Sequence, residues 1–277
     1  MARVIAIANQ KGGVGKTTTA VNLAASLAVA ERRTLLIDGD PQGNATSGTG
    51  IERGSFELTS YDVLLGTADI RSSRLREVQF QHLDVVPATP DLAGAEVELV
   101  DAPERERRMR NAVQAVRDEY DFILIDCPPS LGLITLNMLA AADALLIPVQ
   151  CEYYALEGLS QLLNTVHLIQ HSVNPSLAIS GVLLTMYDAR LNLSRQVATD
   201  AREYFGAQVF ETVVPRNVRL AEAPSFGKPI VLYDVQSIGA QAYIAVANEL
   251  IARESVAAKP RHHELASSDT QTHEAST

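Results

Sequence analysis

A glycine-rich turn between an apolar run and a helix-compatible stretch is the feature that most constrains the fold of this chain. The apolar run 4–8 is followed at 11–18 by the sequence Lys-Gly-Gly-Val-Gly-Lys-Thr-Thr. A strand that passes through such a turn into a helix is the layout of a phosphate-binding loop. Backbone N–H groups and the helix N-terminus then converge on an anionic polyphosphate. The sequence therefore predicts a nucleotide-binding protein.

The spelling of this loop departs from the general pattern Gly-x-x-x-x-Gly-Lys-Ser/Thr, because position 10 is Gln10 instead of glycine. A second lysine, Lys11, follows it. Lys16 stands where the usual lysine contacts the β- and γ-phosphates, and Thr17 stands where the hydroxyl binds Mg²⁺. Lys16 is expected to bind the phosphates of the chain's own nucleotide. The additional Lys11 therefore indicates that a second group needs positive charge, such as one across a dimer interface.

Apolar, strand-like runs alternate with helix-like segments along most of the chain. This alternation predicts an α/β fold with a mostly parallel, doubly wound sheet and helices on both faces. The predicted strands are 4–8, 34–37, 83–87, 122–125, 144–149, 179–185 and 209–214. The predicted helices are 17–30, 104–119, 133–141, 156–170, 194–205 and 238–253. Without an internal repeat or linker, we expect a single domain over 1–253 and a disordered polar tail over 254–277.

Composition excludes some classes of protein. The net charge of −10 argues against a protein that coats nucleic acid with its whole surface, but leaves room for a local basic patch. Cys127 and Cys151 lack metal-site spacing and fit a reducing compartment. No apolar stretch is long enough to span a membrane, and the first residues lack the pattern of a signal peptide. We therefore expect a cytoplasmic protein.

Carboxylates follow two of the predicted strands. Asp38 and Asp40 come after the run 34–37, and Asp126 comes after the run 122–125. In parallel sheets, ligands gather at the carboxyl ends of the strands. An aspartate placed there beside a phosphate loop is the expected support for Mg²⁺.

These motifs together resemble the deviant-Walker family of dimeric ATPases, P-loop NTPases with a deviant Walker A motif. The resemblance rests on segments 11–18, 38–44 and 126–130. Two further segments make it closer to the chromosomal ParA (Soj-like) partition proteins, and the resemblance extends from about residue 2 to residue 253. These segments read Gln-Cys-Glu-Tyr-Tyr-Ala-Leu-Glu-Gly at 150–158 and Val-Pro-Arg-Asn-Val-Arg-Leu-Ala-Glu-Ala-Pro at 214–224.

The resemblance implies the roles of the site residues. Lys11 would reach the nucleotide of the partner subunit in an ATP-bound sandwich dimer, and Gly12 would lie where the two subunits meet. Lys11, Lys16 and Asp40 would be the catalytic residues, with Asp40 positioning the attacking water. The residues at the metal site would be Thr17, Asp38 and Asp126. The nucleotide-binding set would be Lys11, Gly12, Gly13, Val14, Gly15, Lys16, Thr17, Thr18, Pro215 and Asn217, the last two bordering the adenine.

The resemblance also implies ATP and Mg²⁺ as cofactors and slow intrinsic hydrolysis, because no arginine finger is evident. The expected partners are a second copy of the chain, nonspecific double-stranded DNA and a ParB-type centromere-binding protein that stimulates hydrolysis. For the DNA contacts the favoured residues are Arg190 and Arg219, with Arg195 and Arg216 nearby in the sequence. Without the resemblance, these arginines would be read as ordinary surface ion pairs.

Three other classes of protein share such a loop. A membrane-positioning ATPase resembling MinD would need an amphipathic C-terminal helix, and 254–277 has no large apolar face. An electron-transfer ATPase resembling the nitrogenase iron protein would need cysteines in a glycine-rich cluster-binding context, which Cys127 and Cys151 lack. A tyrosine kinase would need a tyrosine-rich tail, but the last tyrosine is Tyr243. A related ATPase that positions a cargo other than chromosomes stays the alternative.

Overall fold

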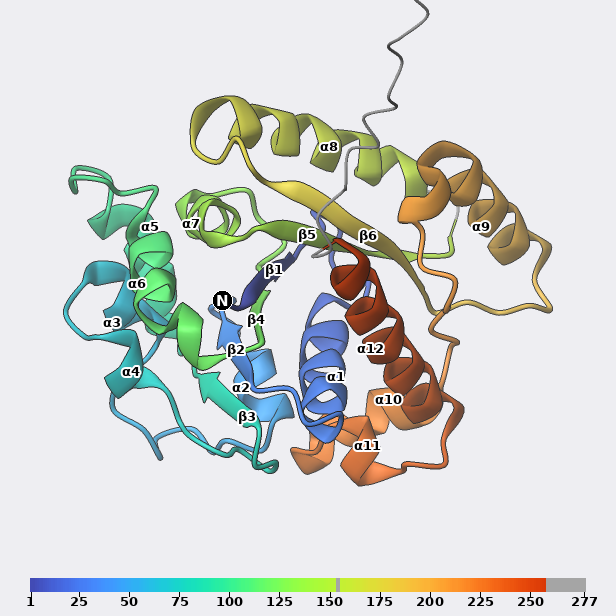
Figure 1. Cartoon of the computed structure of the whole chain (residues 1–277), viewed down its shortest axis with the longest axis horizontal. Coiled ribbons are helices and arrows are strands. Elements are labelled where there is room, and N and C mark those ends of the chain that lie inside the picture. The colour runs from blue at the N-terminus through green and yellow to red at the C-terminus, as the bar shows by residue number, and fades with distance from the viewer. Residues whose placement is uncertain (153–154, 258–277) are drawn as a thin grey trace, which may run out of the picture.

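Six parallel strands form one sheet in the order β3-β2-β4-β1-β5-β6 (Figure 1). The structure is a computed structural model that describes residues 1–152 and 155–257. The parallel sheet confirms the predicted α/β fold class. The strands are β1 (Arg3–Ile7), β2 (Thr34–Asp38), β3 (Leu83–Val86), β4 (Phe122–Asp126), β5 (Ala144–Gln150) and β6 (Ala178–Thr185).

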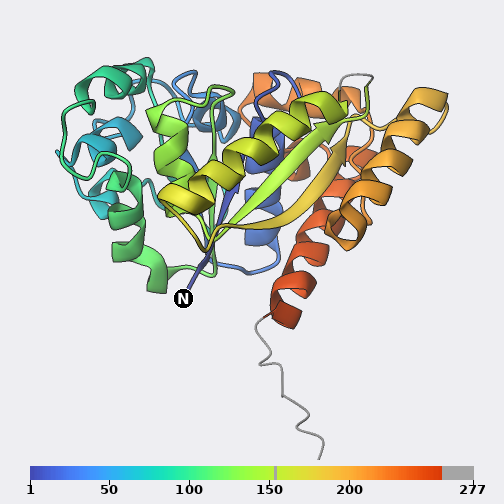
Figure 2. The same ribbon diagram turned by 90° about the horizontal axis from the view of Figure 1, so that it is seen from above.

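Helices cover both faces of this sheet because its strands are apolar on both sides. Along β1, Val4 and Ala6 pack into one core while Ile5 and Ile7 pack into the other. Figures 1 and 2 show α1 and α12 side by side on one face. That face holds α1 (Lys16–Val29), α2 (Asn44–Gly48), α10 (Val218–Glu222), η4 (Ala223–Phe226), α11 (Ile230–Tyr233) and α12 (Ile238–Ala257).

The opposite core is built by the remaining α-helices and one 3₁₀ turn. These are α3 (Ser60–Leu65), α4 (Ile70–Ser73), η1 (Pro90–Gly94), α5 (Ala95–Glu98), α6 (Arg108–Val116), α7 (Leu133–Ala141), α8 (Ala155–Ser172) and α9 (Asn192–Phe205). Two further 3₁₀ turns, η2 (Arg117–Glu119) and η3 (Gly206–Gln208), follow α6 and α9.

The seventh predicted strand, 209–214, is wrong. This segment runs beside β6, where Phe210 N donates to Val182 O and Val214 N donates to Leu184 O, but no ladder forms between these two bonds. The carboxylate of Glu249 on α12 instead accepts hydrogen bonds from the backbone N–H groups of residues 211 and 212, at 2.9 and 3.0 Å. A side chain from another element has thus taken the donors that a strand would need.

Several predicted helix boundaries also differ from the structure, two of them by four residues. The helix expected over 104–119 starts only at Arg108, because Glu104 has a left-handed φ of 51° that no α-helix accommodates. The last helix continues to Ala257, four residues beyond the expected end at 253, and the rest of the predicted tail lies outside the described residues. No helix in the described part of the chain is both long and apolar enough to cross a bilayer.

Candidate nucleotide-binding site

The phosphate loop occupies residues 9–15, between β1 and α1, at the carboxyl end of the central strand. Gly13 and Gly15 have φ values of 74° and 89°, which glycine adopts without strain. Neighbouring strands hold the loop: Thr185 Oγ1 at the end of β6 donates to Val14 O at 2.8 Å. Asn9 Nδ2 likewise donates to Pro148 O of β5 at 2.8 Å. The loop is therefore fixed at the edge of the sheet where parallel-sheet ligands bind.

Lys16 opens α1 and points its ammonium into this site, followed in the first turn of the helix by Thr17 and Thr18. Its Nζ donates to Lys11 O at 3.1 Å. Burial lowers the pKa of Lys16, while the nearby charges of Asp126 and Asp40 oppose that shift. The lysine predicted to bind phosphate thus lies among the carboxylates predicted for metal binding and water positioning.

Asp38 and Asp126 are direct register partners at the ends of β2 and β4, and both are fully buried. Burial raises the pKa of Asp38 to about 6. It also raises the pKa of Asp126 well above its ordinary value; the charge of Asp38 adds to this rise, and the Thr17 hydroxyl opposes it. Two buried carboxyls with raised pKa values, in direct register, form a site that favours a cation.

The two carboxylates differ in what already binds them. Within the described residues, neither oxygen of Asp126 has a hydrogen-bond partner. A buried carboxylate without partners is costly unless a cation or a proton compensates it. Mg²⁺ binds through one or two carboxylates together with substrate phosphates. The unpartnered Asp126, with the Thr17 hydroxyl near it, therefore fits a magnesium ion.

Asp40 lies on the loop that joins β2 to α2. Gln42 N donates to its Oδ1 at 3.0 Å, and Gly43 N donates to its backbone O at 2.9 Å. The side chain is largely buried, and its charge acts on Lys16. The loop thus brings Asp40 to the same edge of the sheet as the phosphate loop.

Lys11 and Gly12 face a different environment from Lys16. The Lys11 side chain is about one-third exposed, and its Nζ lies 4.0 Å from Glu152 Oε2. The other oxygen of Glu152 lies 3.5 Å from an Arg216 nitrogen. A Cβ added at Gly12 would meet no heavy atom of the described residues within 4 Å, its chain neighbours aside. This part of the loop is open to a further molecule.

Pro215 and Asn217 lie near the end of β6, the strand whose Thr185 holds the phosphate loop. Pro215 pairs with Tyr187 in an isolated parallel bridge. Asn217 is the N-cap of α10, and its Oδ1 accepts from Leu220 N at 3.2 Å. Their predicted contact with adenine stays a prediction.

The two arginines predicted to contact DNA are exposed, and each is paired with at least one carboxylate close to it in the sequence. Arg190 contacts both oxygens of Asp188, at 2.9 and 2.7 Å. Arg219 lies 3.0 Å from Glu222 and 3.6 Å from Asp234. The bridge between Tyr187 and Pro215 joins the two segments that carry these arginines. The structure therefore brings the two segments together just beyond the end of β6.

Three residues of the site were missed in the sequence. Thr185 could have been found, because it is a polar residue at the end of an apolar strand. Glu152 and Thr46, a residue of α2, carry no comparable signal, since their partners Lys11 and Asp38 reach them only in the folded chain.

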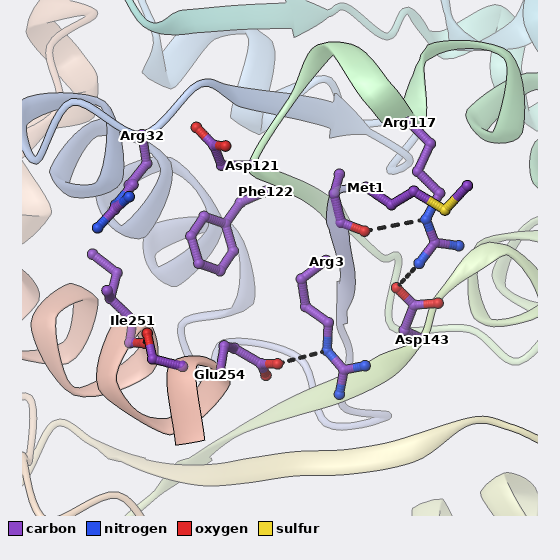
Figure 3. Close-up of a pocket in the computed structure, with 11 residues that line it drawn as sticks. Met1, Arg3, Arg32, Arg117, Asp121, Phe122, Asp143, Ile251 and Glu254 are labelled. Carbon is purple, nitrogen blue, oxygen red and sulfur yellow. Dashed lines mark hydrogen bonds and ion pairs between the residues drawn. The ribbon is translucent and has the colours of Figure 1, made fainter. Parts of the chain in front are cut away.

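The opposite end of the sheet holds a cavity of about 480 Å³ (Figure 3). Two of its arginines are paired: Arg3 Nε lies 3.0 Å from Glu254 Oε2, and Arg117 binds both the Asp143 carboxylate and the backbone O of Ala2. At this end of the sheet, one ion pair thus joins β1 to α12, and another joins η2 to the residue that precedes β5.

Comparison with known proteins decides the family. A family model described as an AAA domain matches residues 2–179. Over 253 residues the chain is 60% identical to the chromosome partitioning protein ParA of Myxococcus xanthus, which covers 91% of this chain and 89% of that protein. It is 58% identical over 252 residues to the sporulation initiation inhibitor protein Soj of Bacillus subtilis, covering 91% and 99%. The chain belongs to the ParA/Soj family of chromosome-partitioning ATPases.

Solved structures agree with this family assignment. A Mycobacterium smegmatis protein described as cobyrinic acid a,c-diamide synthase, with bound ADP and magnesium, has a TM-score of 0.81 and 36% identity, covering 93% of this chain and 97% of that one. The septum site-determining protein MinD of Pyrococcus horikoshii, complexed with Mg-ADP, has a TM-score of 0.74 and 28% identity, covering 94% and 100%. These neighbours contain the adenine nucleotide and metal that were predicted from the sequence of this ParA/Soj family member.

Proposed function

We propose that this ParA/Soj family member is an ATP-driven dimeric switch that binds DNA nonspecifically and partitions chromosomes or plasmids with a ParB-type partner. The observation that carries the proposal is the division between the two loop lysines. Lys16 lies among Asp126 and Asp40, whereas the Lys11 side chain is about one-third exposed beside Glu152, next to the open space at Gly12. A second subunit that approaches at Gly12 would bring its own Lys11 to this chain's nucleotide.

Within one subunit, the phosphate loop and Lys16 would bind the phosphates of ATP, while Thr17 and Asp126 would hold Mg²⁺. When bound, the ion would neutralise charge on the β- and γ-phosphate oxygens. Both oxygens of Asp38 already accept hydrogen bonds, from Asp40 N and Thr46 N. Asp38 would therefore support the metal site by fixing the loop that follows β2. Pro215 and Asn217 would border the adenine.

Asp40 would orient the water that attacks the γ-phosphate and releases ADP and phosphate. Positioned charge is the main contribution that a protein makes to this reaction. Lys16 and the partner's Lys11 would supply it, and without an arginine finger the intrinsic rate would be slow. A ParB-type partner and DNA would then raise the rate and reset the switch.

Arg190 and Arg219 would contact DNA phosphates, and dimerisation would double their number. Phosphate contacts need cations but no base-specific groups, so binding would be independent of sequence. The protein would then be cytoplasmic and associated with the nucleoid while ATP is bound, without need of a membrane.

The first test is DNA binding by Asp40→Ala, in which hydrolysis should be slow enough to trap the ATP state. Binding to unrelated DNA sequences is measured with ATP, with ADP and without nucleotide, over a range of salt concentrations. Salt-sensitive binding that appears only with ATP would support the switch. If ATP-driven dimers form but bind no DNA in any state, the protein would be a related ATPase that positions a different cargo.

A further inference from the structure

One threonine of α2 binds the ends of two strands at once. Thr46 N and Thr46 Oγ1 both donate to Asp38 Oδ2, each at 2.7 Å. The same hydroxyl oxygen accepts from Ala88 N, just after β3, at 2.9 Å. Thr46 is 2% exposed, so these bonds are shielded from water. Its hydroxyl therefore joins β2, α2 and the loop after β3 at a single buried point.

This point closes the loop that carries Asp40. The loop leaves β2 at Asp38, whose Oδ1 accepts from Asp40 N at 3.2 Å, and it returns to Asp38 through Thr46. Between these bonds, Gly43 approaches Ala88 so closely that an added Cβ would lie 3.0 Å from the Ala88 carbonyl oxygen. The segment 38–46 is thus a ring held at both ends, with Asp40 on it.

We infer that Thr46 is a positioning residue for ATP hydrolysis, acting through Asp38 and its loop on Asp40. The inference rests on the catalytic role proposed above for Asp40. A hydrolytic group must be held to within a fraction of an ångström, and a misplacement of about 1 Å can lower a rate about 100-fold. Among the described residues, the side-chain hydrogen bonds of Thr46 go to Asp38 and Ala88 and none goes to the phosphate loop, so we expect it to affect the rate through the position of the loop.

The chemistry of the side chain makes this testable. Valine has nearly the shape of threonine but can neither donate to Asp38 nor accept from Ala88 N, whereas serine keeps both functions. Thr49 is a matched control, because it lies at the end of the same helix, is 1% exposed, and its hydroxyl donates only to backbone oxygens, those of Ala45 and Thr46. Thr49→Val therefore removes a buried hydroxyl of α2 without touching Asp38.

The experiment compares kcat for ATP with the dissociation constants for a fluorescent ATP analogue, with and without Mg²⁺. We expect Thr46→Val to lower kcat about 10- to 100-fold while changing nucleotide affinity less than about threefold. Thr46→Ser should restore the rate, and Thr49→Val should keep it. If Thr46→Val does not fold, Thr46→Cys, which keeps a weak donor of similar size, takes its place. Equal losses in Thr46→Val and Thr49→Val, or in Thr46→Val and Thr46→Ser, would overturn the inference.

A second arm separates this inference from the proposed function. If Thr46 acts through Asp40, Thr46→Val should lower the rate no further in an Asp40→Ala background. A wild-type rate in Thr46→Val, with the rate lost in Asp40→Ala, overturns the positioning role of Thr46 alone. An unchanged rate in Asp40→Ala overturns both the catalytic role of Asp40 and the inference built on it.

Discussion

At the scale of single residues, Asp38 and Asp126 show how different surroundings give two identical side chains different roles. They are register partners and are equally buried, yet loop groups bind both oxygens of Asp38 while none of the described residues binds those of Asp126. Asp38 thus organises backbone, and Asp126 keeps its oxygens available for a cation. The sequence, which places an aspartate at the end of each strand, does not distinguish them.

The raised pKa of Asp38 predicts a pH-dependent stability. With its folded-state pKa at about 6, the folded metal-free protein keeps a proton that the unfolded chain loses near pH 4. The contribution of Asp38 to the free energy of unfolding should therefore fall as pH rises from about 4 to about 6, by up to about 3 kcal/mol. Above that window it should stay constant.

Urea unfolding of the metal-free wild type and of Asp38→Asn between pH 4 and pH 8 measures this effect. The variant cannot titrate at this position, so the stability of the wild type relative to it should decrease through the window. Asp118→Asn, at an exposed carboxylate, controls for the chemical change. A difference between wild type and Asp38→Asn that is independent of pH would contradict the prediction.

The motif residues were predictable from the sequence because short-range order determines their places. Lys16 and Thr17 follow a glycine turn, and Asp126 follows an apolar strand, so local pattern alone puts them at the sheet edge. Thr46 and Glu152 were not predictable. Ala88, which binds the Thr46 hydroxyl, and Lys11, which pairs with Glu152, lie on other segments, and which segments meet is decided by the packing of the whole sheet.

At the scale of elements, α7 has a helix start that its own sequence does not provide. Its N-cap is Gly132, which has no side chain to accept a hydrogen bond. Glu96 of α5 takes that place: its oxygens accept from Leu133 N at 2.7 Å and from Ile134 N at 3.2 Å. A carboxylate at this end of a helix also interacts favourably with the helix dipole.

Replacing Glu96 by alanine should lower the free energy of unfolding by about 1–2 kcal/mol, the range for loss of a helix cap. Glu98→Ala is the control, because Glu98 lies on the same helix and, among the described residues, accepts a hydrogen bond only from the exposed hydroxyl of Tyr61. Chemical unfolding of both variants measures the difference. Equal stability losses would show that the cap contributes nothing beyond an ordinary surface contact.

The elements that could be predicted are the long or strongly apolar ones. Six of the seven apolar runs became strands, and 209–214 failed because the partner of its backbone, Glu249, is remote in sequence. The short helices between residues 44 and 98 were missed, since four to six residues are too few for a helical period to appear. Capping signals were present, however: Thr59 and Asp62 form a capping box at the start of α3.

At the scale of the whole molecule, the two ends of the sheet differ in what their charged groups do. At the carboxyl end, Asp126 has no hydrogen-bond partner among the described residues, Lys11 is partly exposed and Gly12 borders open space, as a site that binds other molecules requires. At the amino end, charges such as those of Arg117 and Asp143 are paired with each other (Figure 3). We expect the charged groups at the carboxyl end to bind ligands and those at the amino end to stabilise the fold.

Gly12→Val tests the site of subunit contact. The added side chain meets open space in one subunit, and Gly12 lacks the positive φ of Gly13 and Gly15, so the monomer should fold and bind nucleotide normally. A close approach of a second subunit would be blocked. Analytical ultracentrifugation with ATP and Mg²⁺ should show a dimer for Asp40→Ala and a monomer for the double variant Gly12→Val/Asp40→Ala. A dimer in the double variant would contradict contact at Gly12.

Combined Arg190→Ala and Arg219→Ala should weaken DNA binding and leave ATP-driven dimerisation intact. Each phosphate contact contributes about 0.9 to the slope of log affinity against log salt, so a dimer that loses four contacts should lose about 3–4 from that slope. The control is the double variant Arg33→Ala/Arg76→Ala. These two arginines line a pocket elsewhere on the molecule, together with Asp84 and Glu119. An unchanged slope in the Arg190/Arg219 variant would place the DNA contacts on other residues.

The strand order has a consequence for how the chain is made. The first strand to leave the ribosome, β1, occupies the middle of the sheet and pairs only with β4 and β5, the nearer of which follows about 120 residues later. At about 5–20 residues per second, translation leaves this apolar strand without its neighbours for about 6–24 s. Meanwhile β2 and β3 can already pair with each other. The phosphate loop, attached to β1, is therefore synthesised early but acquires its final surroundings late.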